Sequence, residues 1–342
     1  MKHLYEYVSP EQSGHQYDDY NLRDNKIVDA RYTETGVYQN PYIEALPFAK
    51  TSQEVVETIN NVPSLPSREE FFKKPEPIRD MILDTIKQYK IALSFNAELE
   101  KEFARVLRES YAMRCDQPAE FEVSVKGVPF QAQSKLDAYH PGEAVPGFAM
   151  LGVAGCGKST AMNMVFDHYP QVIIHHWKDP EETRVQIVYL FVTCSPKSNF
   201  RALYVSIGKA IDAALKNRNT VYEDTIRRAG NLGQMAQKIE ELIEKFAIGI
   251  IVFDEIQNIN MNYTAENSIE ALLKINNNTH VGMGVLGTEE AFKGLFTRDR
   301  TARRFESYIS AGRYCTDMEQ FTTIIQGLFL SNLFEKTPVV DD

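Results

Sequence analysis

The sequence predicts an α/β fold with a parallel sheet flanked by helices, and three observations carry this prediction. A glycine-rich motif at residues 152–160 lies between a short apolar run and a helical pattern. A second apolar run, at residues 247–253, ends in two carboxylates. Strand-like and helical segments then alternate up to residue 296. Such alternation is typical of parallel sheets with right-handed crossovers.

The composition limits the classes of protein to consider. The chain has 342 residues, 43% of them hydrophobic, and a formal net charge of −10. It is therefore not a globally basic nucleic-acid coat, and any contact with DNA must come from a local patch. The four cysteines lie far apart without metal-ligand spacing, which indicates a reduced, cytoplasmic protein. No signal sequence and no run of ~20 apolar residues is present, so we expect no membrane partner.

The first 140 residues are expected to form two accessory regions. Residues 1–50 are predicted to be an extended, tyrosine-rich arm with a partner-docking segment at residues 40–48. Residues 51–140 are predicted to be mainly helical, with a hairpin at residues 121–130. Two alternatives stay open for the helical pattern at residues 68–114, an accessory domain or helices packed on the core.

The glycine-rich motif fits G-x-x-x-x-G-K-[ST], the phosphate-binding loop (P-loop) of nucleotide hydrolases. Its three glycines are expected to take positive φ angles that turn backbone N–H groups inward, and the helix that follows adds its N-terminal N–H groups. Lys158 is expected to reach the β- and γ-phosphates, and the Ser159 hydroxyl to ligate Mg²⁺. The predicted nucleotide-binding residues are Gly152, Val153, Ala154, Gly155, Cys156, Gly157, Lys158, Ser159 and Thr160. A chance match is disfavoured because a strand precedes the motif and a helix follows it.

The second apolar run is predicted to be a central parallel strand. Ligands of α/β proteins bind at the carboxyl ends of such strands. We therefore expect Asp254 to hold the Mg²⁺ ion, and Glu255 to orient or deprotonate the attacking water. The alternative, a solvated helix N-terminus, is disfavoured because the pair ends an apolar strand about a hundred residues after the P-loop.

Periodicity predicts the remaining elements of the core. Strands are expected at residues 172–174, 186–192 and 281–286, and helices at residues 201–217, 232–246, 267–275 and 289–296. These limits place the nucleotide-binding core at residues 141–305. Residues 306–342 are left as a partial C-terminal helical segment.

The order of motifs resembles that of the AAA+ ATPases: P-loop, strand ending in Asp-Glu, strand ending in a small polar residue, then an arginine pair. The resemblance implies that Thr288 senses the γ-phosphate. It also implies that Arg303 or Arg304 is an arginine finger, a side chain that completes the active site of a neighbouring subunit. Arg298 and Arg300 are the next candidates for this role.

Four short sequence segments, called blocks below, narrow the resemblance to one family of AAA+ ATPases. Residues 40–47, residues 169–173, residues 188–190 with 194–195, and residues 254–257 closely resemble the TnsC family, AAA+ regulators of Tn-seven-type transposons and their CRISPR-associated relatives. The resemblance runs from about residue 36 to about residue 304. Relatives carry a long region beyond the arginine pair, so we expect residues 306–342 to be a truncated lid.

The same resemblance implies cofactors and partners. The cofactors would be ATP and Mg²⁺. The chain would assemble with itself as a ring or filament on double-stranded DNA in the bacterial cytoplasm. It would link a target-selector protein of the TnsD or TniQ type to transposase subunits of the TnsA or TnsB type.

A local basic region suggests how DNA would be held. Residues 197–228 contain seven basic and three acidic residues, a local balance of +4. We expect Lys197, and less strongly Lys216, Arg218 and Thr220, to contact phosphates without reading sequence. The alternative for these residues is a solvated helix face.

Two other functions stay open. The first is a helicase loader or replication-initiation ATPase with a similar core. The second is a scaffold that uses ATP only as an assembly signal. Glu255 argues against the scaffold, because a nucleotide-holding switch does not need a carboxylate that orients water.

Overall fold

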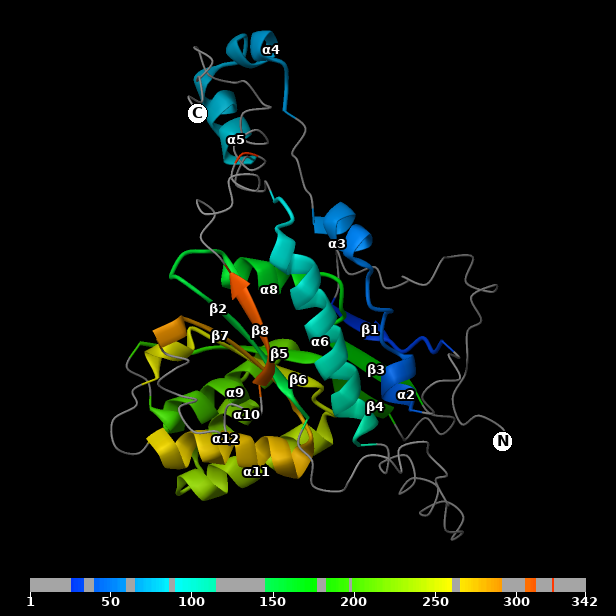
Figure 1. The fold of residues 1–342 in the computed structure, drawn as a ribbon, viewed down its shortest axis with the longest axis vertical. Helices are drawn as coiled ribbons and strands as arrows, with labels where there is room; N and C mark the ends of the chain where they lie inside the picture. The colour runs from blue at the N-terminus through cyan, green and yellow to red at the C-terminus, as the bar shows by residue number, and fades with distance from the viewer. Residues whose placement is uncertain are drawn as a thin grey trace.

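The computed structural model has a five-stranded parallel sheet at its centre (Figure 1), as the sequence predicts. It describes residues 26–33, 40–59, 65–85, 90–114, 145–176, 183–196, 199–259, 265–290, 305–311 and 322. The strand order is β5-β6-β7-β2-β8, and every neighbouring pair is parallel. The strands are β2 (Gly147–Gly152), β5 (Tyr189–Thr193), β6 (Ile250–Asp254), β7 (Gly282–Gly287) and β8 (Phe305–Ala311).

Helices cover both faces of this sheet (Figure 1). One face carries α9 (Phe200–Ala214), α10 (Val221–Arg227), α11 (Leu232–Lys245) and α12 (Ala265–Thr279). The other carries α6 (Ser94–Ala112) and α8 (Lys158–Phe166). Asn199 and Asn231 begin α9 and α11 by accepting hydrogen bonds from backbone N–H groups of the first turn, which satisfies donors that a helix leaves unpaired.

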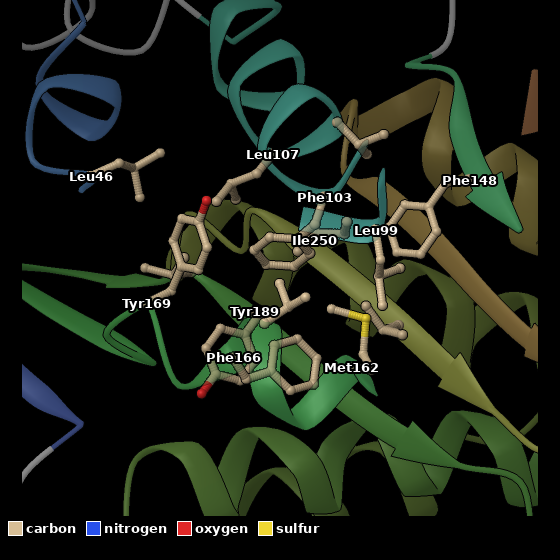
Figure 2. Close-up of a cluster of buried hydrophobic side chains, with 14 of the residues drawn as sticks. Leu46, Leu99, Phe103, Leu107, Phe148, Met162, Phe166, Tyr169, Tyr189 and Ile250 are labelled. Carbon is tan, nitrogen blue, oxygen red and sulfur yellow. The ribbon is translucent and has the colours of Figure 1, made fainter. Parts of the chain in front are cut away.

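The alternation of side chains along each strand explains the two layers of core. In β6, Ile250 and Val252 enter the core shared with α6 and α8, and Ile251 and Phe253 enter the core shared with α9 and α11. Figure 2 shows Ile250 among the side chains of Leu99 and Phe103 of α6 and of Met162 and Phe166 of α8. A strand buried on both faces needs a continuous apolar run, which is the pattern found before Asp254.

The prediction of a single strand at residues 186–192 is wrong. It divides at Val188 into β4 (Thr183–Ile187), which pairs antiparallel with β3 (Val172–His176), and β5, which pairs parallel with β6. Val188 donates its N–H to the carbonyl of Gln171 and accepts from the N–H of Ile250. The chain therefore changes partner at this residue, within an apolar run from Ile187 to Val192.

The described part of the predicted N-terminal arm is packed on the core and is not extended away from it. β1 (Ile27–Asp29) pairs with β3, which gives a three-stranded sheet in the order β1-β3-β4. α2 (Pro41–Glu44) buries Tyr42 and Ile43 in the core shared with α6. Asn40 accepts from the N–H of Tyr42 and donates to the carbonyl of Tyr111 at 2.8 Å. Residues 40–47 are thus a structural part of the core, because their apolar side chains are already covered.

The helical region at residues 51–114 divides between the two alternatives. α3 (Ser52–Ile59) and the 19-residue α6 pack on the body, whereas α4 (Arg68–Phe72) and α5 (Glu76–Thr85) stand away from the sheet (Figure 1). No residue of α5 is buried. The predicted hairpin at residues 121–130 lies outside the described residues. Within the described part of the chain, no helix is both long and apolar enough to cross a membrane.

The sheet continues past the predicted end of the core at residue 305. β8 pairs with β2 from Phe305 opposite Gly147 to Ala311 opposite Gly152, with a register shift between Gly147 and Phe148. This edge strand was not predicted, because polar residues interrupt its sequence, FESYISA. The expected lid segment beyond it falls outside the described residues except for residue 322.

A buried polar network joins the three-stranded sheet to α2. The His175 ring lies 2.7 Å from the Tyr32 hydroxyl through Nδ1 and 2.8 Å from Gln186 Oε1 through Nε2. The Gln186 amide donates to the carbonyl of Tyr42. Burial lowers the pKa of His175 from 6.5 to about 4. His176 faces the opposite side of the strand and contacts Asp29 at the surface.

This network makes stability depend on pH. Below pH 6.5 the unfolded chain binds a proton at His175, whereas the folded chain does not bind it until about pH 4. The free energy of unfolding therefore decreases as the pH is lowered through this window. Between pH 6.5 and pH 5 we expect His175 to account for a loss of about 1–2 kcal/mol. Urea unfolding should show a shallower loss over this range for His175→Gln than for the wild type. Equal slopes would contradict the expectation.

Candidate active site

The P-loop connects the end of β2 to the start of α8. Gly155 and Gly157 have φ angles of 80° and 88°, in the left-handed region that glycine tolerates. Gly152 does not share this conformation, so the prediction is wrong for that residue. It is needed for space, because a Cβ atom there would lie 2.5 Å from the carbonyl oxygen of Ala311 on β8. The loop tip at residues 153–155 is exposed.

Lys158 places its ammonium group inside this loop. The side chain is 4% exposed, and Nζ donates to the carbonyls of Gly152 at 3.0 Å and Val153 at 2.9 Å. Cys156 is buried beside it, with Sγ 3.8 Å from Nζ. The charge lies at the N-terminus of α8, where the helix dipole also favours anions. The loop therefore offers two features that bind phosphate.

The structure brings together Ser159 and Asp254, the two residues predicted to hold Mg²⁺. The Ser159 hydroxyl donates to Asp254 Oδ2 at 2.7 Å, and Asp254 Oδ1 accepts from the N–H of Glu255. A hydroxyl and a carboxylate oxygen are ligands that Mg²⁺ accepts, together with phosphates and water. Among the described residues no cluster of three or more His, Cys, Asp or Glu side chains could hold a metal by itself. The pair fits a metal ion that is shared with a phosphate ligand.

Glu255 and Thr288 lie at the same edge of the sheet. Glu255 follows β6 with a φ angle of 55°, and its carboxylate accepts a hydrogen bond from the Gln257 amide. Thr288 follows β7, which pairs in parallel with β6. The strands β6, β7 and β2 lie side by side in the sheet. The structure thus gathers at their carboxyl ends the residues Lys158, Ser159, Asp254, Glu255 and Thr288.

Sequence reasoning missed two polar side chains at this edge, Gln257 and Asn258. They belong to η3 (Ile256–Asn258), the short 3₁₀ turn after Glu255. Their position directly after the Asp-Glu pair was a signal that could have identified them.

Cys194 also lies at this edge but has no nucleophilic role. Burial, then the charges of Asp254 and Glu255, raise the pKa of its thiol to about 12. A thiol with such a pKa stays protonated near neutral pH and is inert as a nucleophile.

The candidate DNA-binding residues lie elsewhere. Lys216, Arg218 and Thr220 are exposed in the turn between α9 and α10. Buried Asp212 fixes this turn by accepting hydrogen bonds from Asn217 Nδ2 and from the N–H groups of Tyr222 and Glu223. Lys197 and the four arginines Arg298, Arg300, Arg303 and Arg304 lie outside the described residues.

Other members of the basic region have structural roles. Arg201 donates to the carbonyls of Arg227 and Ala229, and Arg227 and Arg228 pair with Glu223 and Asp224. The solvated-helix alternative therefore describes these three arginines better than a DNA contact does.

Comparison with known proteins agrees with this geometry. A family model described as an AAA domain matches residues 148–295. No curated protein matches the chain. The match and the five-stranded parallel sheet identify the fold as the AAA+ P-loop fold.

Three solved structures resemble the chain distantly. Cdc6p from Pyrobaculum aerophilum is 14% identical over 53% of this chain and 42% of that one, with a TM-score of 0.36. The ORC1 protein of Aeropyrum pernix in complex with DNA is 12% identical over 67% and 48%, with a TM-score of 0.40. A Walker-type ATPase of Pyrococcus abyssi is 13% identical over 65% and 60%, with a TM-score of 0.36. The chain thus spans about half the length of these proteins.

Lys158→Ala should abolish most nucleotide binding. The substitution removes the cation from the phosphate cradle, and the loss of hydrogen bonds to a charged group weakens affinity by about 10- to 100-fold. Binding of ATP can be measured by calorimetry. Lys238→Ala is the matched control, because Lys238 pairs with exposed Glu241 on α11. Equal affinities for the wild type and Lys158→Ala would show that the nucleotide binds elsewhere.

Proposed function

We propose, from the premise that residues 148–295 form an AAA+ ATPase domain, that the chain is a DNA-binding regulator of DNA transposition of the TnsC type. With ATP and Mg²⁺ bound it would assemble as a ring or filament on double-stranded DNA. It would there connect a target selector of the TnsD or TniQ type to a transposase of the TnsA or TnsB type. The observation that carries the ATP-dependent part is the 2.7 Å contact between Ser159 and Asp254 beside the P-loop.

The described residues divide the work of hydrolysis between them. Lys158 would hold the β- and γ-phosphates, and Ser159 and Asp254 would hold Mg²⁺, which neutralises phosphate charge when bound. Glu255 would accept a proton from the attacking water or orient that water. Thr288, at the end of the neighbouring strand, would contact the γ-phosphate.

The transposition part of the proposal is supported by how the four blocks of the TnsC resemblance are arranged. Val188 donates its N–H to the carbonyl of Gln171, which joins the second and third blocks. Gln186, two residues before the third block, donates to the carbonyl of Tyr42 in the first block. The fourth block is connected to the third through β5 and β6. Stretches that lie far apart in the sequence thus belong to one connected unit, as expected when a resemblance reflects a shared structure.

The sheet order favours action of the arginine pair across a subunit interface. Phe305, the residue after Arg304, lies opposite Gly147 at the amino end of β2, whereas the P-loop follows Gly152 at the carboxyl end. A finger acting within its own subunit would have to span the length of β2. We therefore propose that Arg303 or Arg304 reaches the nucleotide of a neighbouring copy.

The turn between α9 and α10 suits phosphate contacts. Asp212 fixes its backbone from inside, while Lys216 and Arg218 remain at the surface. Little backbone freedom is then given up when the turn meets DNA. We propose this turn, with Lys197, as the DNA-binding surface.

Electron microscopy of the chain with duplex DNA and a slowly hydrolysed ATP analogue tests the proposed function. We expect rings or filaments on DNA that bind a target selector and a transposase subunit when these are added. Assemblies that instead recruit a replicative helicase, and bind no transposase, would favour the helicase-loader or replication-initiation function. Failure to assemble on DNA in the presence of the analogue would contradict the proposal.

Removal of the proposed phosphate-binding side chains should weaken binding to every DNA sequence alike. We expect this for Lys197→Ala and for the double variant Lys216→Ala/Arg218→Ala. The slope of log affinity against log salt should become shallower by about 0.9 for each phosphate that the variant no longer neutralises. Fluorescence anisotropy over a salt series measures both quantities, with Lys238→Ala as the control for the removal of a surface charge. A weakening limited to particular sequences would indicate base readout and contradict the assignment.

Mixing two inactive variants tests action in trans. Glu255→Gln keeps its arginines, and Arg303→Ala/Arg304→Ala keeps its Glu255. A finger arginine contributes roughly 10³–10⁵ in rate in GTPase examples, so each variant alone should be nearly inactive. Mixed oligomers should regain part of the ATPase activity at interfaces that combine an intact Glu255 with intact arginines. No recovery in oligomers shown to be mixed would contradict the role of these arginines.

A further inference from the structure

The turn after Glu255 is fixed on both sides. Asn258 at its end donates through Nδ2 to the carbonyl of Cys194, just past β5, at 2.9 Å. Ile256 at its start packs against Gly287 at the end of β7, where an added Cβ would lie 2.5 Å from Ile256 Cγ2. The backbone between these two anchors is therefore held in place, and so is the Cα atom of the side chain that lies between them.

Gln257 lies between the two anchors and binds the Glu255 carboxylate. Its Nε2 donates to Glu255 Oε2. Among the described residues, no other side chain donates a hydrogen bond to this carboxylate. One oxygen of the carboxylate is thus held, and the other is left for a ligand.

The second polar atom of the same amide is buried without a partner. Gln257 Oε1 makes no hydrogen bond to any residue that the structure describes, and a Cβ at Gly287 would lie 3.2 Å from it. Leaving a buried acceptor unpaired costs about 1–3 kcal/mol. A side chain kept in such a position at the edge of an active site invites a functional explanation.

We propose that Gln257 is a positioning residue for ATP hydrolysis, which acts by holding Oε2 of Glu255 so that Oε1 faces the attacking water. Glu255 takes the left-handed backbone conformation at φ 55° as the N-cap residue of η3, and the Gln257 amide is the side-chain donor that orients its carboxylate there. The inference rests on the proposed role of Glu255. It adds a specific residue that fixes the orientation of the base, and orientation of reacting groups makes a large contribution to enzyme rates.

Gln257→Ala should therefore lower kcat for ATP by about tenfold or more and leave KM for ATP within about twofold, because the amide contacts the base and not the nucleotide. Gln257→Glu keeps the size of the side chain but has no donor when ionised, so it should lose at least as much. The matched control is Asn258→Ala, which loosens the same turn through Cys194 without touching Glu255. Rates are measured with the full chain at saturating duplex DNA.

A double-mutant cycle separates positioning from a structural role. In the Glu255→Gln background, Gln257→Ala should have no further effect on kcat, whereas Asn258→Ala should lower the rate by the same factor in both backgrounds. If Glu255→Gln by itself leaves hydrolysis unchanged, the proposed base is wrong and the inference falls with it. If Glu255→Gln is slow but Gln257→Ala is additive with it, unchanged or faster than the wild type, the role of Glu255 stands and that of Gln257 is overturned.

Discussion

The hydrogen bond between Ser159 and Asp254 joins the P-loop helix to the end of β6. The strand order of the central sheet makes this contact possible. Ser159 follows β2 and Asp254 ends β6, and these strands are not neighbours, because β7 lies between them. Parallel pairing through β7 brings both carboxyl ends to one edge. The apolar cores on the two faces then hold this register, since a slip of one residue would move every side chain of a strand from one core into the other.

Helix α6 braces the same arrangement from the N-terminal region. Its buried Glu100 accepts from the Tyr169 hydroxyl and contacts His168 at 3.0 Å, which fixes the end of α8 opposite the P-loop. At its other end, Ser110 and Arg114 donate to the carbonyls of Gly249 and Ile248, just before β6. Helix α6 and the residues just after it thus contact both elements that carry the Ser159–Asp254 pair, and burial lowers the pKa of Arg114 to about 10. This explains why the region before the P-loop is integral to the domain.

Site residues that belong to a motif of fixed local spacing were predictable from the sequence. Features that depend on contacts between distant segments of the chain were not. The P-loop, Ser159 and Asp254 follow from a fixed motif and a fully buried strand. The division at Val188 could not be predicted, because an apolar run does not reveal where the hydrogen-bonding partner changes. The need for Gly152 depends on Ala311 in an unpredicted edge strand. Gln257 was visible in the sequence, but its contact with Glu255 required the geometry of the turn.

The central claim is that Ser159 and Asp254 together hold a metal ion on the nucleotide, and a change of metal preference tests it most directly. Ser159→Cys replaces the hydroxyl by a soft thiolate ligand, which favours softer ions than Mg²⁺. We predict that ATP hydrolysis by this variant is lost with Mg²⁺ and restored in part with Cd²⁺, relative to the wild type under the same ions. Hydrolysis with Mg²⁺ that equals the wild-type rate, or no difference in metal preference between the two proteins, would contradict the account.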